Sequence, residues 1–332
     1  MKEKLKNLKF KRWQKVLAII LGVLLILTSI LFVRAQVQGR SATSLLLEDV
    51  FSLIPLKDRR DEAVFQEALD ANSVPYELPD STREKYDIME YDDYTDTFVI
   101  SPETDDGELV IFYLHGGGYW SQPLSLHYSF FNSISNELNA QLVLPIYPKA
   151  PAYQATEVHE MVMERYLNLV EEHGGDADNI ILMGESAGGG LALSFMQVLR
   201  DKDLPMPQQA ILISPWLDVT CSNPAMVEIQ PHDPLLNIES LGFGGITYAG
   251  DLDPKDPLAS PIYGDLDGLP PITVFTGTHD ILHSDIALYE DIAKDKALDV
   301  TFHVYENQNH CFIGFPIPEG KEALGIILDI LK

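Results

Sequence analysis

Hydrophobic and polar positions divide the chain into two unlike parts. The first contains an uncharged run from Val16 to Val33, which directly follows a basic stretch. From residue 98 onward, short apolar runs alternate with longer stretches in which apolar residues recur every three or four positions. Short apolar runs predict buried strands, and the wider spacing predicts amphipathic helices. The alternation predicts an α/β domain whose mostly parallel sheet carries helices on both faces.

This pattern divides the chain into segments. Residues 41–73 have helical spacing, and residues 74–96 are polar and predicted to link the N-terminal part to a domain at 98–332. The stretch 219–262, rich in Pro, Gly and Asp, is predicted to be an insertion over one end of the sheet. Strands are predicted at 109–114, 142–146, 180–183, 210–213, 272–275 and 300–304, and helices at 126–139, 156–172, 187–200, 284–297 and 319–331.

The uncharged run at 16–33 predicts a membrane anchor. As a helix it would be roughly 27 Å long, close to the hydrocarbon thickness of a bilayer. Residues 1–15 carry seven basic side chains and one acid, which predicts a cytoplasmic N-terminus and a body outside the cell. The alternative is a secreted protein released by cleavage near Ala35. The run is longer than the apolar region of a signal peptide, about 7–15 residues, and Arg34 disturbs the cleavage site.

Composition narrows the possible partners. The chain has 23 Lys and Arg against 50 Asp and Glu, a net charge of −27. Such a body repels polyphosphate, so nucleic acid is not expected as a partner, and neutral or cationic small molecules are favoured. With only Cys221 and Cys311, a disulfide-dense scaffold is excluded. No His, Asp or Glu cluster has metal-ligand spacing, so neither a metal nor another cofactor is expected, and no oligomeric state is predicted.

A serine lies in a glycine turn, Gly184-Glu185-Ser186-Ala187-Gly188, between a predicted strand and a predicted helix. Sharp turns of this kind strain the serine backbone and expose its oxygen, and they need glycine where strand and helix approach closely. The serine also lies at a helix N-terminus, where backbone N–H groups favour negative charge. Ser186 is therefore predicted to be a nucleophile, against the alternative of an ordinary glycine turn.

Three glycines close the strand predicted at 109–114, in His115-Gly116-Gly117-Gly118. Without Cβ atoms, their amides are unshielded and can point toward a developing oxyanion. The amide of Ala187 would complete such an oxyanion hole. A phosphate-binding loop is the alternative, but no Lys-Ser or Lys-Thr pair follows the glycines.

A nucleophilic serine needs a base and an orienting acid. Asp280 follows the strand predicted at 272–275, and His310 follows the strand predicted at 300–304. The carboxyl ends of parallel strands lie at one edge of a sheet, so these side chains are expected to meet near Ser186.

Other residues remain as alternatives for these roles. Asp285 and Glu306 are rival acids, and His279 is a rival base. Cys311 adjoins the proposed base, but a catalytic cysteine needs polar surroundings of its own, so it is expected to be a small buried residue.

The combination of His115-Gly-Gly-Gly118 with Gly184-Glu-Ser-Ala-Gly188 resembles the hormone-sensitive-lipase-like branch of the α/β-hydrolases. The resemblance covers residues 98–332 and extends to several further motifs in the same order. These are Tyr147-Pro-Lys-Ala-Pro151, Ser214-Pro-Trp-Leu-Asp218, Asp256-Pro-Leu-Ala-Ser-Pro261, Leu269-Pro-Pro271, Gly277-Thr-His-Asp280 and His310-Cys-Phe312.

The resemblance implies an α/β-hydrolase fold and a carboxylic-ester hydrolase. Its nucleophile, base and orienting acid would be Ser186, His310 and Asp280. The oxyanion-hole amides would belong to Gly117, Gly118 and Ala187. A helical cap, which this family carries at its N-terminus, would come from residues 41–73. The N-terminal apolar run is not a usual part of the bacterial family pattern, and Cys311 occupies a position where glycine is common.

The substrate pocket is predicted less directly. Tyr119 and Trp120 follow the glycine loop and are expected to wall the site, with core packing as the alternative. Phe243 and Tyr248, in the insertion, are expected to cover an apolar acyl group. Esters with short or medium acyl chains, or acetyl esters, are the expected substrates. A peptidase or acyltransferase with the same three side chains, or an inert surface binding module, remains an alternative function.

Overall fold

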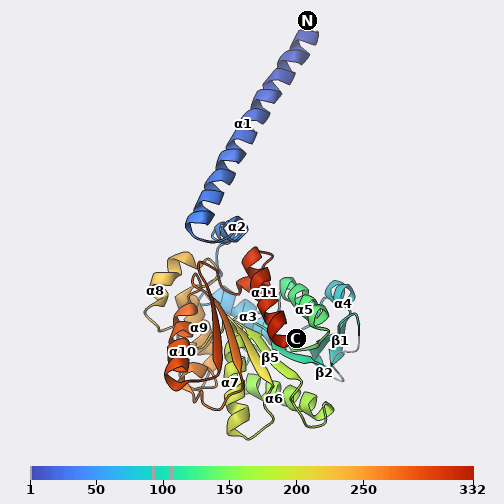
Figure 1. Ribbon diagram of the computed structural model, residues 1–332, viewed down its shortest axis with the longest axis vertical. Coiled ribbons are helices and arrows are strands. Elements are labelled where there is room, and N and C mark those ends of the chain that lie inside the picture. The colour runs from blue at the N-terminus through green and yellow to red at the C-terminus, as the bar shows by residue number, and fades with distance from the viewer. Residues whose placement is uncertain (1, 92–93, 105–107) are drawn as a thin grey trace.

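The core of the protein is one eight-stranded sheet (Figure 1). The computed structural model describes residues 2–91, 94–104 and 108–332, and the side chains of these ranges from residue 13 onward. The strand order is β1-β2-β4-β3-β5-β6-β7-β8, and all pairs from β4 to β8 are parallel. The strands are β1 (Ile88–Tyr91), β2 (Tyr94–Ile100), β3 (Val110–Leu114), β4 (Gln141–Pro145), β5 (Ile180–Glu185), β6 (Gln209–Ile213), β7 (Ile272–Gly277) and β8 (Val300–Tyr305).

Helices cover both faces of this sheet. The α5 helix (Ser125–Leu138) and α11 (Pro318–Leu331) bury one face, where Ile111 and Tyr113 of β3 point. On the opposite face, residues of α6 (Ala155–Glu172), α7 (Ala187–Asp201) and α10 (His283–Lys296) pack with Phe112 and Leu114. Successive residues of a strand point to opposite faces, so a wholly apolar strand fits a sheet covered on both sides. The predicted mostly parallel sheet with two helical layers is confirmed.

Residues 74–96 were wrongly predicted to be only a linking segment. They contain the short helix α4 (Asp80–Tyr86), strand β1 and the start of β2. Both strands pair antiparallel at the edge of the sheet. In β1 the first and last residues, Ile88 and Tyr91, are buried, whereas Met89 and Glu90 between them are exposed. An edge strand tolerates polar residues, which explains why its composition did not suggest a strand.

Two segments from different parts of the chain lie over the carboxyl edge of the sheet. The predicted insertion lies between β6 and β7 and contains α8 (Met226–Ile229), η1 (Gln230–His232), α9 (Ile238–Ala249) and η2 (Pro261–Tyr263). Helix α3 (Glu62–Asn72) packs against α9, since the rings of Phe65 and Phe243 lie 6.3 Å apart. The backbone N–H of Arg59 also donates to Ser240 Oγ at 3.0 Å. Helix α3 and the insertion therefore form one cover over this edge of the sheet.

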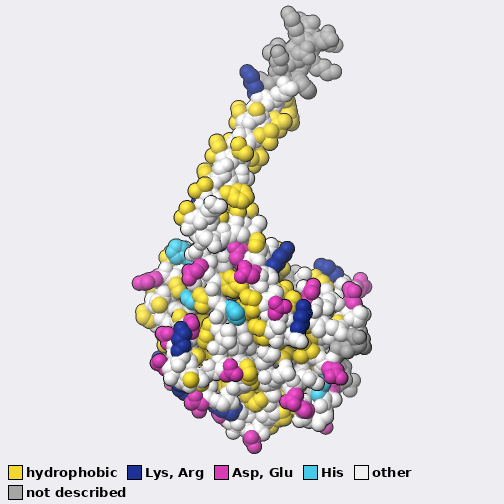
Figure 2. All heavy atoms as spheres, in the orientation of Figure 1, with side chains coloured by type: hydrophobic (Ala, Val, Ile, Leu, Met, Phe, Trp, Pro, Cys, Tyr) yellow, Lys and Arg dark blue, Asp and Glu magenta, His cyan; other side chains and the backbone are white. Residues whose placement is uncertain are grey.

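The first helix, α1 (Lys2–Val37), extends away from the body (Figure 1). In the described part of the chain, Trp13–Val37 is the one segment long and apolar enough to cross a membrane, with a mean hydropathy of 3.1 in its most apolar window and none of that window buried. Figure 2 shows its apolar side chains exposed along the stalk, whereas acidic side chains are scattered over the visible face of the body. The basic residues among positions 1–12 lie outside the range in which the structure describes side chains. At the base of the stalk, α2 (Ala42–Phe51) is joined to α1 by the Arg34–Asp49 ion pair at 2.7 Å.

Candidate active site

The serine turn has the strained geometry that its glycines require. Ser186 joins β5 to α7 with φ 56° and ψ −123°, a backbone conformation that L residues rarely adopt. A Cβ atom on Gly188 would overlap the carbonyl oxygen of Leu114, so only glycine fits there. The N–H of Ser186 donates to the carbonyl oxygen of Ile213 at 2.8 Å. Local backbone packing therefore holds the serine in this conformation.

The structure brings the three predicted side chains into one hydrogen-bonded row. His310 Nε2 lies 2.9 Å from Ser186 Oγ, and His310 Nδ1 lies 2.8 Å from Asp280 Oδ2. Asp280 is fully buried, and its other oxygen accepts the N–H of Leu282 at 2.9 Å. The imidazole is thus oriented by a carboxylate on one side and directed at a hydroxyl on the other.

The rival side chains lie elsewhere. The Asp285 carboxylate accepts a hydrogen bond from Asn223 at 2.8 Å, and the Glu306 carboxylate accepts one from Thr278 at 3.3 Å. His279 contacts a glutamate of α2 instead of Asp280. In the described structure, none of the three contacts Ser186 or His310.

The electrostatic environment of His310 favours its charged form. Burial alone would lower its pKa, but the adjacent Asp280 carboxylate and, after it, the contact with Cys311 together outweigh burial and hold the pKa of His310 well above the ordinary value. An imidazole with a raised pKa is a stronger base once it is neutral. The same carboxylate stabilises the imidazolium that forms when the ring accepts a proton.

The glycine loop is tied to the serine turn by Glu185. The N–H of Gly116 donates to Glu185 Oε1 at 2.5 Å, and the hydroxyl of Tyr113 donates to the other carboxylate oxygen. Burial is the main cause of the raised pKa of Glu185. This contact places the loop directly beside Ser186, because a Cβ on Gly116 would lie 3.1 Å from the serine Cβ.

Three predicted amides remain without protein partners in this loop and turn. Within residues 2–91, 94–104 and 108–332, the N–H groups of Gly117, Gly118 and Ala187 donate no hydrogen bond. Gly117 and Gly118 have φ values of 116° and 63°, which a residue with a side chain would adopt only under strain. Free amides beside a serine are the groups that an oxyanion hole needs.

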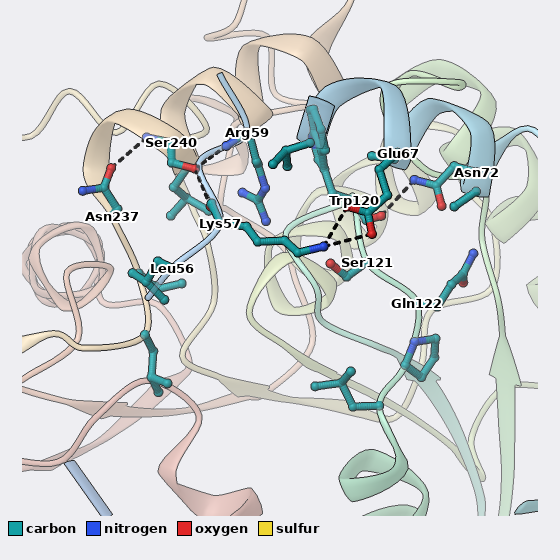
Figure 3. A pocket seen from close by; sticks show the side chains of 18 residues that line it. Leu56, Lys57, Arg59, Glu67, Asn72, Trp120, Ser121, Gln122, Asn237 and Ser240 are labelled. Atoms are coloured by element: carbon teal, nitrogen blue, oxygen red, sulfur yellow. Dashed lines mark hydrogen bonds and ion pairs between the residues drawn. The ribbon is translucent and has the colours of Figure 1, made fainter. Parts of the chain in front are cut away.

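Two adjoining cavities lie near this row of side chains, and one of them reaches it. One, of about 350 Å³, has Ser186 and His310 in its wall, and its remaining lining is largely apolar. The other, of about 440 Å³, lies beneath α3 and α9 (Figure 3). The two share the side chains of Arg59, Ser121, Gln122, Leu124, Leu235, Leu236 and Leu241. The cover formed by α3 and α9 therefore contributes to a continuous binding space.

Of the predicted pocket residues, Trp120 alone lines one of these two cavities. Tyr119 lines neither cavity, because its buried ring stacks on Tyr248 at 3.6 Å with an interplanar angle of 3°. Both tyrosines are therefore core residues, and their assignment to the pocket was wrong. Trp120 lines the larger cavity. Phe243 lines neither, since its ring packs against Phe65 and Trp120 from outside.

The loop that carries His310 is held by the segment just after α1. Asn307 Nδ2 donates to the carbonyl oxygen of Gln38 at 2.7 Å, and Arg40 donates to the carbonyl oxygen of Asn307 at 2.5 Å. Arg40 is also paired with Glu48 of α2 at 2.7 Å. Asn309, the residue before His310, donates to the same glutamate at 3.1 Å. We call this set of contacts the base-loop clamp.

Charge dominates the base-loop clamp. Burial would raise the pKa of Glu48, but hydrogen bonds from His279 and Arg40 lower it to about 2. The Arg40 side chain has no exposed surface. Its guanidinium therefore depends on the ionised carboxylate beside it, and breaking the pair would leave a buried unpaired charge.

Two residues near the row make contacts that the sequence did not predict. Cys311 was expected to be a small buried residue, yet it is only half-buried and lines the smaller cavity, with its Sγ 3.4 Å from His310 Nε2. Burial raises the pKa of its thiol, which keeps it protonated and weakly nucleophilic. Glu185 was visible within the serine motif, but its contact with the glycine loop depends on the pairing of β3 with β5.

Residues of the types that bind metals are dispersed. Within the described ranges, no three His, Cys, Asp or Glu side chains lie close enough together to hold a metal ion. The polar side chains at the smaller cavity include the Ser186 hydroxyl, the His310 imidazole, the Glu185 carboxylate, the Cys311 thiol and the Arg59 guanidinium.

A mostly parallel sheet with a serine turn at the end of β5 defines the α/β-hydrolase class, and comparisons with known proteins agree. The family model described as alpha/beta hydrolase fold matches residues 111–314. An acetyl-hydrolase of Streptomyces hygroscopicus is 31% identical over 229 residues, which cover 68% of this chain and 76% of that protein.

Solved structures extend the likeness to most of the chain. A candidate esterase from Staphylococcus aureus has a TM-score of 0.76 and 29% identity, covering 84% of this chain and 94% of that one. An esterase of the bacterial hormone-sensitive lipase family has a TM-score of 0.66 and 27% identity, covering 83% and 98%. The chain belongs to the α/β-hydrolase fold family, in its hormone-sensitive-lipase-like carboxylesterase branch. The predicted fold class and the prediction of a carboxylic-ester hydrolase are confirmed.

Proposed function

We propose that this protein is a membrane-anchored serine esterase that hydrolyses short- to medium-chain or acetyl esters outside the cell. The observation that carries the proposal is the row from Ser186 Oγ through His310 to Asp280, with separations of 2.9 and 2.8 Å. Each atom is within hydrogen-bonding reach of the next, as nucleophile activation by a base requires.

Acylation begins at the serine. His310 Nε2 accepts the Ser186 proton as the oxygen attacks the ester carbonyl, and Asp280 stabilises the resulting imidazolium. The carbonyl oxygen becomes an oxyanion that accepts hydrogen bonds from the amides of Gly117, Gly118 and Ala187. In other enzymes a single such donor is worth on the order of 3 kcal/mol.

The remaining steps use the same groups. The imidazolium returns its proton to the departing alcohol, which leaves an acyl group on Ser186. A water molecule then attacks this acyl-enzyme while His310 takes up its proton. When the bond to Ser186 Oγ breaks, the imidazolium returns this proton to the serine oxygen, and the carboxylic acid is released. Asp280 keeps one imidazole tautomer in place throughout, so that Nε2 always faces the reacting oxygen.

The size and lining of the smaller cavity support small acyl groups. Its volume of about 350 Å³ is at the lower end of ligand sites in proteins, and its walls are largely apolar. The similarity to an acetyl-hydrolase also supports this substrate class.

The anchor assignment rests on α1. Its unburied apolar segment is long enough to span a bilayer, and the basic residues precede it, so the N-terminus is proposed to lie in the cytoplasm. The catalytic body would then be held outside the cell by a single helix. Secretion after signal cleavage is the alternative.

Hydrolysis of p-nitrophenyl acetate and butyrate by the full chain in detergent micelles tests the reaction. Ser186→Ala is expected to lower kcat to near background, by at least about 10³-fold, because no other group can carry the acyl intermediate. Ser194→Ala is the matched control, since this buried serine of α7 lines neither cavity. Unchanged turnover in Ser186→Ala contradicts the mechanism, and efficient cleavage of the matching p-nitroanilide would favour a peptidase.

A membrane-impermeant fluorophosphonate probe applied to intact cells tests the topology. The wild-type protein should be labelled before lysis and remain in the membrane fraction, whereas Ser186→Ala should not be labelled at all. Labelling only after lysis would place the body on the other side of the membrane. Labelled protein in the medium would favour the secreted form.

A further inference from the structure

One arginine lies in the binding space without an acidic partner. Seven arginines have described side chains, and six of them pair with a carboxylate within 4.0 Å. The exception is Arg59, which lines both cavities. In a chain with 50 acidic residues, a largely buried guanidinium that lacks one is unusual.

The structure builds a place for this guanidinium. A Cβ on Gly244 of α9 would lie 2.8 Å from Arg59 Cδ, and a Cβ on Gly118 of the glycine loop would overlap Arg59 Nη2. The guanidinium carbon also lies 5.6 Å from the centre of the Trp120 ring. Two glycines and an aromatic ring therefore hold the side chain where the two cavities meet, and Figure 3 shows it between the segments that carry Ser240 and Trp120.

The donors of this side chain are available to a ligand. Within the described residues, the backbone N–H of Arg59 is bonded to Ser240, but its guanidinium makes no hydrogen bond to protein. Burial lowers its pKa to about 10, so it stays charged at neutral pH. The nearest titratable influence on it is Cys221, whose pKa burial raises to about 12 and which is therefore a neutral thiol.

We propose that Arg59 is a specificity residue that binds a second, anionic group of the substrate, so that the preferred esters carry a carboxylate remote from the scissile bond. The proposal rests on the esterase function described above. A planar guanidinium pairs with a carboxylate through two parallel hydrogen bonds, and it does so most strongly where water is partly excluded. Since Arg59 borders Gly118, the anionic group would lie next to the oxyanion loop, and the scissile carbonyl would remain at Ser186.

This local charge opposes the field of the whole molecule. Beyond the first 15 residues the chain has a net charge of −33, which repels anions in general. The subsite would therefore select anionic esters only once they reach the cavity. Their binding should be more favourable in moderate salt, where long-range repulsion is screened and the short-range pair is less affected.

A matched substrate pair tests the proposal with the full chain in detergent micelles. The substrates are mono-p-nitrophenyl adipate, which ends in a carboxylate, and its methyl ester, which has the same acyl chain without the charge. Wild-type kcat/KM is expected to be at least about tenfold higher for the half-acid, mainly through KM. Half-acids from succinate to suberate locate the best chain length.

Variants separate recognition from packing. Arg59→Met should lower kcat/KM for the half-acid at least about tenfold more than for the methyl ester, and Arg59→Lys should restore part of the difference. Arg60→Met is the control, because Arg60 is exposed and paired with Asp58 and Glu239, and it should change neither value. If Arg59→Met does not fold, inhibition of wild-type butyrate hydrolysis by monomethyl adipate, compared with dimethyl adipate, measures the same preference.

The outcomes are distinct. Equal losses on both substrates in Arg59→Met, or a wild-type preference for the methyl ester over the whole chain-length series, overturn the subsite. Absence of hydrolysis of both p-nitrophenyl esters by the wild-type chain would instead contradict the esterase function itself.

Discussion

The serine turn and the loop that carries His310 supply the two groups proposed to react with an ester, yet they are held in place in different ways. Ser186 is fixed by neighbours within a few residues and by adjacent strands, through glycine contacts and backbone hydrogen bonds. His310 follows a loop fixed by side chains more than 250 residues away in sequence, chiefly Arg40 and Glu48. The proposed nucleophile depends on backbone geometry, whereas the proposed base depends on a charged contact with the segment that follows α1.

This difference implies different sensitivities. A glycine contact cannot be screened or titrated, so the serine turn should respond only to substitutions that add volume. A charged clamp can be weakened by neutralising one side chain or by lowering the pH. The two regions should therefore fail under separate conditions, and substitutions can test each one alone.

The largest expected effect lies at the junction of the two regions. Asp280→Asn should lower kcat by about 10⁴-fold, as in other triads, because the imidazole loses the partner that selects its tautomer. Asp285→Asn is the matched control, since that buried aspartate pairs with Asn223 instead of His310. Steady-state kinetics on p-nitrophenyl butyrate measures both. Comparable losses in the two variants would mean that the acid has been misassigned.

Adding one methyl group to the serine turn should be the next largest. Gly188→Ala places a Cβ against the carbonyl oxygen of Leu114, a backbone atom that cannot move without shifting β3. Overpacking usually costs about 1–3 kcal/mol and sometimes more, and here the added atom meets backbone and not a flexible side chain, so we expect a loss above about 4 kcal/mol. Urea unfolding followed by circular dichroism measures the loss, and Gly325→Ala, where a Cβ meets nothing within 4 Å, is the control. Equal stability of the two variants would contradict the close approach.

Neutralising the clamp should affect the base loop. Glu48→Gln leaves the buried Arg40 without a charge partner, which should cost about 2–4 kcal/mol of unfolding free energy and lower kcat more than it raises KM. Glu290→Gln provides the control, because its partner Lys294 on α10 is exposed, such pairs are worth about 0–1 kcal/mol, and Glu290 lines neither cavity. A loss of stability with unchanged kcat would separate the clamp from catalysis.

The clamp should also weaken in acid. The folded-state pKa of Glu48 is lowered to about 2, below the value near 4.3 expected in the unfolded chain. Its contribution is therefore complete above pH 4.3 and is lost as the pH falls toward 2. Because the carboxylate is partly exposed, we expect about 1–2 kcal/mol from this group. The stability difference between wild type and Glu48→Gln, measured at pH 6 and pH 3, should shrink at the lower pH.

The smallest effect is expected at the ion pair between α1 and α2. Arg34→Ala removes a partner from Asp49, but both side chains are nearly half exposed, so the change should be below about 1 kcal/mol. Turnover of soluble esters should not change, because the clamp begins beyond this pair. A large fall in kcat would show that the orientation of the anchor matters to the base loop.

Sequence patterns predicted most of what depends on short-range order. The strands at the centre of the sheet were recognisable because both faces of each are buried, as in Ile111 and Phe112. The serine turn was recognisable because its glycines lie within five consecutive positions. Strands β1 and β2 were missed, since β1 lies at an edge of the sheet, where exposed residues such as Met89 and Glu90 are allowed, whereas the other edge strand, β8, was recognised at 300–304.

The contacts of the N-terminal segment with the body could not be predicted in this way. Nothing in the sequence pairs Glu48 with Asn309, or sets Arg59 between Gly118 and Gly244, because these contacts depend on how the N-terminal segment lies over the finished sheet. Tyr119 follows the glycine loop in sequence, but its ring turns away from the cavity to stack on Tyr248.

The end of α1 has a consequence for the timing of maturation. Ala35, the position nearest to a cleavage site, is only 2% exposed where the stalk joins the body. Arg34 and Val37 on either side are exposed, but a peptidase that has to bind the small side chain of Ala35 would find it enclosed after folding and would therefore have to act earlier. A product cut there would retain Gln38, Arg40 and Glu48. The base-loop clamp would therefore hold the loop of His310 in the same way with or without α1.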